Sequence, residues 1–178
     1  PGDFEARIAL ESVGTLPSLS LRTDPEIITK AIEVLQARRR EAEDKQSKAV
    51  LVNRRSQLFY DPSSPVGGNL SGDITVIEFF DYRCGVCKRV HPIVENLIKS
   101  DQKIRRVYKE WPILGADSVT AARAALASHR QGEYVAFHNA MMEARVRLNK
   151  PSIMAIARRV GLDSKKLTRD MDSPEITG

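Results

Sequence analysis

Residues 74–88 read Ile-Thr-Val-Ile-Glu-Phe-Phe-Asp-Tyr-Arg-Cys-Gly-Val-Cys-Lys, and this stretch decides the fold. Its first seven residues are all β-branched or aromatic apart from Glu78, a composition typical of a buried central strand. A Cys-x-x-Cys motif follows at Cys84 and Cys87, and these are the two cysteines of the chain. Apolar residues then recur at helical spacing to about residue 98. A strand that leads into a helix beginning with two cysteines is typical of a redox-active dithiol.

The position of each cysteine predicts its chemical role. Cys84 lies at the helix N-terminus, where unpaired backbone N–H groups and the positive end of the helix dipole favour a thiolate and lower the thiol pKa. Cys87 lies one turn further inside. We therefore predict that Cys84 forms the mixed disulfide and that Cys87 resolves it. The intervening pair, Gly85-Val86, offers no further donor to the thiolate, so we expect a less oxidising couple than one with His between the cysteines.

Glu78 is the third candidate site residue, six positions before Cys84. A carboxylate in an apolar strand has a raised pKa and could carry protons to or from Cys87, through water. The alternative is an ordinary strand-end carboxylate near water. His91, one turn after Cys87, reads as a half-exposed helix histidine that could also approach the sulfurs.

Two other interpretations of the cysteine pair are weaker. A structural zinc site needs four ligands, and no second cysteine pair or paired histidines are present. An inert disulfide across one helical turn would close too short a loop to constrain the unfolded chain much. We therefore expect no cofactor and no resident metal.

The rest of the chain predicts one further long strand and several helices. The strand covers Ile104–Trp111, with Trp111 and Tyr108 in the core, and a short edge strand lies near Pro65–Gly68. The later helices are expected at Asp117–Arg130, Glu133–Leu148, Pro151–Val160 and Ser164–Met171.

A long helix is expected before the dithiol segment, from Pro25 to Leu58, after a short helix at Phe4–Ser12. Its apolar residues recur every seven positions, but the other seam position falls on Arg39 and Gln46, which a strong coiled coil avoids. We read it as a helix that associates loosely with partner chains. The alternative is that it packs on its own domain.

Composition and charge limit the classes of function that this chain can have. The 178 residues include 28 Lys and Arg against 23 Asp and Glu, and the two signs are interspersed. The arginine clusters are not interleaved with aromatic residues, so we expect no nucleic-acid binding. No apolar stretch is long enough to cross a bilayer. The chain opens on Pro1 without a basic-then-apolar leader, so secretion is inferred only from the chemistry.

Residues 76–88 closely resemble the active-site segment of DsbA-like thiol-disulfide oxidoreductases, and residues 111–115 resemble the segment leading into their inserted helical domain. Residues 24–26, the long helix and residues 61–66 are similar to the branch that contains the ScsC and Com1-like proteins. By position, Cys84 matches the attacking cysteine, Cys87 its partner and Glu78 the buried acid.

The resemblance implies an α/β, thioredoxin-like fold with an inserted helical domain and a long N-terminal helix. Residues 1–60 would form a helical oligomerisation region, 61–115 the first thioredoxin-like half and 116–178 the helical insertion. In this family a cis-proline loop and closing strands follow the insertion. None of the prolines here occupies that place, so we expect the fold to be truncated before that loop.

The expected function is periplasmic thiol-disulfide exchange on secreted proteins, with disulfide isomerase favoured over dithiol oxidase. An oligomer would let several dithiols act on one substrate, and the couple is expected to be mild. The implied partners are unfolded or misoxidised secreted proteins, a membrane redox partner and further copies of the chain, with a trimer among the oligomers known in the branch. The alternative is a Cu(I)-binding protein that uses both soft thiolates.

Overall fold

The computed structural model describes residues 25–177, and the chain divides into two compact units between Arg54 and Arg55. Each unit is described by itself. The predicted domain ranges 1–60, 61–115 and 116–178 stay predictions, and the predicted helix at Phe4–Ser12 lies outside the described residues. Within residues 25–177, no helix combines the length and the apolar character needed to cross a lipid bilayer.

The described part of the first unit is helix α3, Pro25–Asn53. Residues 26–53 are all exposed, including Leu35 at 56% and Val52 at 74%. Ion pairs one turn apart join Lys30 to Glu26 and Lys45 to Glu41 along this surface. The long predicted helix is therefore confirmed through Asn53. It is interrupted at Arg54, and the remaining turn is a separate helix, α4 (Arg55–Phe59), of the second unit.

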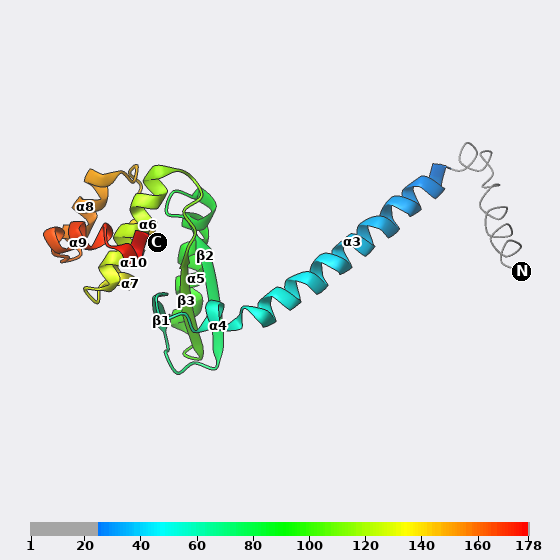
Figure 1. The fold of residues 1–178 in the computed structure, drawn as a ribbon, viewed down its shortest axis with the longest axis horizontal. Coiled ribbons are helices and arrows are strands. Elements are labelled where there is room, and N and C mark those ends of the chain that lie inside the picture. The colour runs from blue at the N-terminus through cyan, green and yellow to red at the C-terminus, as the bar shows by residue number, and fades with distance from the viewer. Residues whose placement is uncertain (1–24, 178) are drawn as a thin grey trace, which may run out of the picture. The chain divides into compact units, whose positions relative to one another are not determined.

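A three-stranded sheet organises the second unit, in the order β1-β3-β2 (Figure 1). Strand β1 (Val66–Gly68) runs antiparallel to β3 (Ile104–Glu110), and β2 (Ile74–Phe80) runs parallel to β3. The bounds of β2 agree with the prediction, but β3 is the central strand. No further strand pairs with β2 among the described residues, which leaves its Phe79 half exposed.

Six helices complete the second unit beside α4. Helix α5 connects the two parallel strands, and the helices after β3 gather as one group beside the sheet (Figure 1). Close packing of α6 is possible because its inward residues Ala121, Ala124 and Ala125 are fully buried. The bounds are α5 Gly85–Ser100, α6 Ala116–His129, α7 Tyr134–Glu143, α8 Lys150–Arg159, α9 Ser164–Met171 and α10 Pro174–Thr177.

Three local expectations are wrong. Helix α7 ends at Glu143 instead of Leu148, because Ala144 adopts an extended backbone. Trp111 is 54% exposed and packs edge-on against Phe79 with ring centroids 5.9 Å apart, outside the core that holds Tyr108. His91 is 1% exposed, not half exposed.

Candidate active site at the start of helix α5

Cys84 is the N-cap residue of α5, and its sulfur faces the first turn of the helix. Its backbone is extended (φ −72°, ψ 112°), and Sγ accepts a hydrogen bond from the Cys87 N–H at 3.3 Å. The Cys84 N–H in turn donates to the Asp81 carbonyl at 3.0 Å. Both cysteines are partly buried and carry free thiols. The structure thus places the two predicted sulfurs on the first turn of one helix.

The two thiols are shifted in opposite directions. The Cys87 thiol, as a hydrogen-bond donor, lowers the pKa of Cys84, and the backbone N–H groups of Cys87 and Val86 lower it further. Burial raises the pKa of Cys87, and the hydrogen bond to Cys84 raises it as well. Cys84 therefore ionises before Cys87, the order needed for an attacking and a resolving thiol. The largest cause is the partner thiol, whereas we had expected the helix terminus to dominate.

The loop before the dithiol is tied to the segment that opens α6. Asp81 Oδ1 accepts from the Arg83 N–H (2.7 Å) and from the Ser118 hydroxyl (2.8 Å), and Oδ2 accepts from the Leu114 N–H (3.0 Å). The Ser118 hydroxyl thus binds Asp81 and does not cap α6. The N-cap residue of α6 is Gly115. Its φ of 100° is a backbone conformation that glycine adopts more readily than residues with a side chain. These bonds fix the backbone from which Cys84 projects.

Lys88 ties the dithiol helix to the end of α7. Its ammonium group donates to the carbonyls of Met141 (2.6 Å), Met142 (3.2 Å) and Ala144 (3.0 Å). These carbonyls lack partners within their own helix, so Lys88 caps the C-terminus of α7. This contact supplies partners to the carbonyls at the point where α7 ends.

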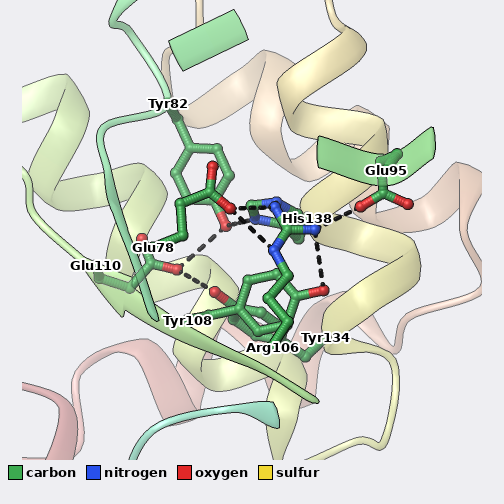
Figure 2. A network of polar contacts seen from close by, with 8 residues as sticks. All are labelled: Glu78, Tyr82, Glu95, Arg106, Tyr108, Glu110, Tyr134 and His138. Carbon is green, nitrogen blue, oxygen red and sulfur yellow. Dashed lines mark hydrogen bonds and ion pairs between the residues drawn. The ribbon is translucent and has the colours of Figure 1, made fainter. Parts of the chain in front are cut away.

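Glu78 lies on β2 and is ion-paired with Arg106 of β3, as Figure 2 shows. The side chain of Arg106 is fully buried, and its guanidinium also binds Glu95 and stacks over the Tyr108 ring at 4.4 Å. Glu78 is therefore not the unpaired buried acid that the sequence suggested. It does line one hollow of about 230 Å³ together with Cys87. That shared hollow is compatible with the predicted proton transfer, which stays a prediction.

His91 is buried beside His138, and its predicted approach to the sulfurs stays a prediction. Its ring centroid lies 5.3 Å from that of His138, and neither of its ring nitrogens has a hydrogen-bond partner among the described residues. Burial lowers the pKa of His91, so the ring is neutral at physiological pH.

A metal site receives no support beyond the two sulfurs. Among residues 25–177, no group of three or more His, Cys, Asp and Glu side chains is arranged to hold a metal ion. A Cu(I) ion bound here would therefore have the thiolates of Cys84 and Cys87 as its ligands among the described residues. The copper hypothesis stays a prediction.

The parallel strands joined by α5, with a dithiol at the start of that helix, define a thioredoxin-like oxidoreductase site. The family model of the DSBA-like thioredoxin domain matches residues 75–178, more than half of the chain. The chain therefore belongs to the DSBA-like thioredoxin domain family. This membership confirms the predicted α/β, thioredoxin-like fold and classes the chain as a thiol-disulfide oxidoreductase, and α3 of the structure is the predicted long N-terminal helix. The expected truncation before the cis-proline loop stays a prediction.

Solved structures agree with the family. A thioredoxin-like oxidoreductase from Silicibacter pomeroyi is 52% identical, with 69% of this chain and 71% of that chain covered and a TM-score of 0.68. BcfH from Salmonella enterica Typhimurium is 29% identical, with coverages of 93% and 72% and a TM-score of 0.76. ScsC from Proteus mirabilis is 25% identical, with coverages of 93% and 80% and a TM-score of 0.63. The predicted likeness to the ScsC branch is thereby confirmed.

Curated relatives of this chain are much longer proteins. The Na(+)/H(+) antiporter NhaA 1 of Salinispora arenicola is 28% identical over 100 residues, which is 55% of this chain. The chain spans about 15% of the length of the curated relatives it matches.

Proposed function

We propose that this chain catalyses thiol-disulfide exchange on secreted proteins in the periplasm, with Cys84 as the attacking thiolate and Cys87 as the resolving thiol. One observation carries the proposal: the Cys84 sulfur accepts the Cys87 N–H at the start of α5 while the two thiol pKa values move apart. The periplasm is proposed because substrate disulfides persist in oxidising compartments.

The proposed reaction needs no group other than the dithiol and the substrate disulfide. The Cys84 thiolate attacks one sulfur of the substrate disulfide, so a mixed disulfide forms and the other substrate sulfur leaves as a thiolate. Cys87 then loses its proton and attacks the Cys84 sulfur, which forms the Cys84–Cys87 disulfide and releases the second substrate thiolate. Two electrons pass to the substrate, and the reverse sequence oxidises a substrate dithiol. Glu78, across the shared hollow, is the candidate acceptor for the Cys87 proton.

The first test is the pH dependence of alkylation of the reduced protein. Because the thiolate is the reactive form and the pKa of Cys84 is lowered, Cys84 should react faster at pH 7 than an ordinary exposed cysteine does. Cys87, with its raised pKa, should react only at higher pH. Mass spectrometry of the labelled peptides measures both rates. A Cys84 profile identical to that of free cysteine would contradict the proposal.

Within this class we propose an isomerase in preference to a dithiol oxidase. The Gly85-Val86 pair leaves the Cys84 thiolate with few added donors, which supports a mild couple whose dithiol form persists. We expect the reduced protein to restore activity to a substrate with scrambled disulfides. It should oxidise a reduced substrate slowly, and its potential against glutathione should be that of a mild oxidant. Rapid oxidation without refolding of the scrambled substrate would reverse this assignment.

We also propose that α3 mediates self-association, which would bring several dithiols to one substrate. Ile28 and Leu35, seven residues apart, are 49% and 56% exposed on a helix that buries no residue between 26 and 53. The double variant Ile28→Glu/Leu35→Glu should lower the mass measured by light scattering to that of one chain. The matched variant Thr29→Glu/Gln36→Glu, one position along, should remain associated. A wild-type protein that is monomeric at high concentration would refute this proposal. The membrane redox partner is proposed from the need to recycle the dithiol.

A further inference from the structure

Glu110 is a partly buried residue, and two tyrosines converge on its carboxyl group (Figure 2). Its Oε1 accepts from the Tyr82 hydroxyl at 3.1 Å and from the Tyr134 hydroxyl at 2.6 Å. Its Oε2 is shielded from solvent and has no partner within the described residues. Glu110 ends β3, Tyr134 begins α7, and Tyr82 lies on the dithiol loop, two residues before Cys84. One carboxylate oxygen thus joins three separate parts of the second unit.

The hydrogen bonds around Tyr82 have one consistent direction. Arg106 can only donate, so Nε2 of His138, 3.5 Å from Nη2, accepts. Burial lowers the pKa of His138, so the neutral ring carries its single proton on Nδ1. Nδ1 then donates to the Tyr82 oxygen at 3.0 Å. The proton of the Tyr82 hydroxyl is then donated to Glu110, with the Tyr134 hydroxyl also within hydrogen-bonding range of the Tyr82 oxygen.

We propose that Glu110 is a positioning residue for the dithiol, acting through the Tyr82 hydroxyl on the loop that carries Cys84. This inference rests on the proposed function of Cys84 as the reactive thiolate. Tyr82 is 1% exposed, so packing confines its ring to one position in the core. Its hydroxyl is held by His138 on one side and by Glu110 on the other. Asp81 holds the loop through its bonds to the Arg83 and Leu114 N–H groups. A shift of the Tyr82 ring would therefore be passed to the backbone between Tyr82 and Cys84.

Loss of the acceptor would leave the Tyr82 proton without a partner. The alternative is to move the His138 proton to Nε2, where it would point at the Arg106 guanidinium. Either outcome leaves a buried donor unsatisfied, which is unfavourable and favours movement of the ring. Movement of the loop would then weaken the contacts of Cys84 Sγ with the Cys87 thiol and the Cys87 N–H, and both contacts lower the pKa of Cys84.

The decisive comparison uses Tyr82→Phe and Tyr134→Phe. Both variants remove one hydroxyl from the same carboxylate oxygen, and both tyrosines are buried, at 1% and 3% exposure. Only Tyr82 belongs to the dithiol loop. The readout is the rate of Cys84 alkylation between pH 5 and 9, with thermal unfolding measured on the same samples.

We expect Tyr82→Phe to slow Cys84 alkylation at pH 6 by about three- to tenfold, since each unit of pKa changes the thiolate fraction tenfold. Tyr134→Phe should leave the alkylation profile within about 1.5-fold of wild type. Equal effects of both variants, or no effect of Tyr82→Phe, would overturn the proposal. The wild-type profile separately tests whether Cys84 is the reactive thiolate, so the two failures are distinguishable.

A second pair keeps the test decisive if Tyr82→Phe does not fold. Glu110→Gln retains an acceptor oxygen for both tyrosines, whereas Glu110→Leu has none. Glu110→Gln should therefore keep the wild-type alkylation profile, and Glu110→Leu should show the slowed profile. A Glu110→Gln profile as slow as that of Glu110→Leu, or a wild-type profile in Glu110→Leu, would overturn the proposal.

Discussion

Replacing Cys84 with serine is expected to abolish thiol-disulfide exchange, lowering the rate by a factor on the order of 10³ or more. A serine hydroxyl is not ionised at neutral pH and cannot form a disulfide, whereas the Cys84 thiol has a lowered pKa. The measurement is the rate at which the reduced protein cleaves a disulfide-linked fluorescent peptide. Circular dichroism shows whether the variant is folded.

The matched variant Cys87→Ser separates the two roles. Cys84 still attacks in this variant, but no second thiol resolves the product, so a mixed disulfide with the substrate should accumulate. Non-reducing electrophoresis and intact mass measure this species. Wild-type exchange by Cys84→Ser, or a trapped complex on Cys84→Ser instead of Cys87→Ser, would contradict the assignment of the two sulfurs.

The second large effect concerns the pH dependence of stability. Burial raises the pKa of Glu110 from 4.5 to about 8, against the opposing effect of the Tyr134 and Tyr82 hydrogen bonds, and the nearby Asp81 charge raises it further. Between pH 4.5 and 8 the unfolded chain has released this proton and the folded chain has kept it. The free energy of unfolding should therefore fall by about 1.4 kcal/mol per pH unit, and by about 5 kcal/mol over the window.

The sign follows from the raised pKa in the folded state. The contribution of Glu110 is fully present below pH 4.5 and is lost as the pH rises through 8. Denaturant unfolding of wild type and Glu110→Gln at several pH values isolates this term, because other groups such as His138 cancel in the difference. Glu143→Gln, which removes an exposed carboxylate, should follow wild type. A constant difference between wild type and Glu110→Gln from pH 5 to 8 would show that Glu110 is ionised in the fold.

The dithiol segment could be predicted because its signals are local. The β-branched run sets β2 at Ile74–Phe80, and the two cysteines mark the start of α5 at Gly85. Helix α9, Ser164–Met171, also agrees with the prediction, since Asp163 caps it with bonds to the next turn. In each case the residues that decide the element lie within one turn or one strand of it.

The polar network could not be predicted because each of its bonds joins distant parts of the chain. Arg106 reads in sequence as one of two adjacent arginines, yet it is fully buried and Arg105 is not. The available signal was alternation. Because alternate residues of a strand face the same side of the sheet, Arg106 points to the same side as Ile104 and Tyr108. Its partner Glu78 is paired with Tyr108 in the parallel register. A charged residue at an inward position of one strand, beside an acid on the next, indicates a buried pair.

The early end of α7 has the same explanation. The sequence around residues 143–148 contains no strong stop signal, and Lys88, whose ammonium group binds the carbonyls at the end of the helix, lies more than 50 positions earlier. Similarly, the exposure of Trp111 depends on which strands flank β2. Such features follow from tertiary contacts, which override local preference.

The three bonds of Lys88 also bear on the transfer of this chemistry to other scaffolds. All three ammonium protons are engaged by the carbonyls at the end of α7. A planar guanidinium has a different donor geometry, so arginine is not a conservative replacement at this position. A designer who grafts the Cys-x-x-Cys helix alone would transplant a lysine with nothing to cap. The unit to transfer is therefore helix α5 together with helix α7 and its C-cap residue, residues 134–144.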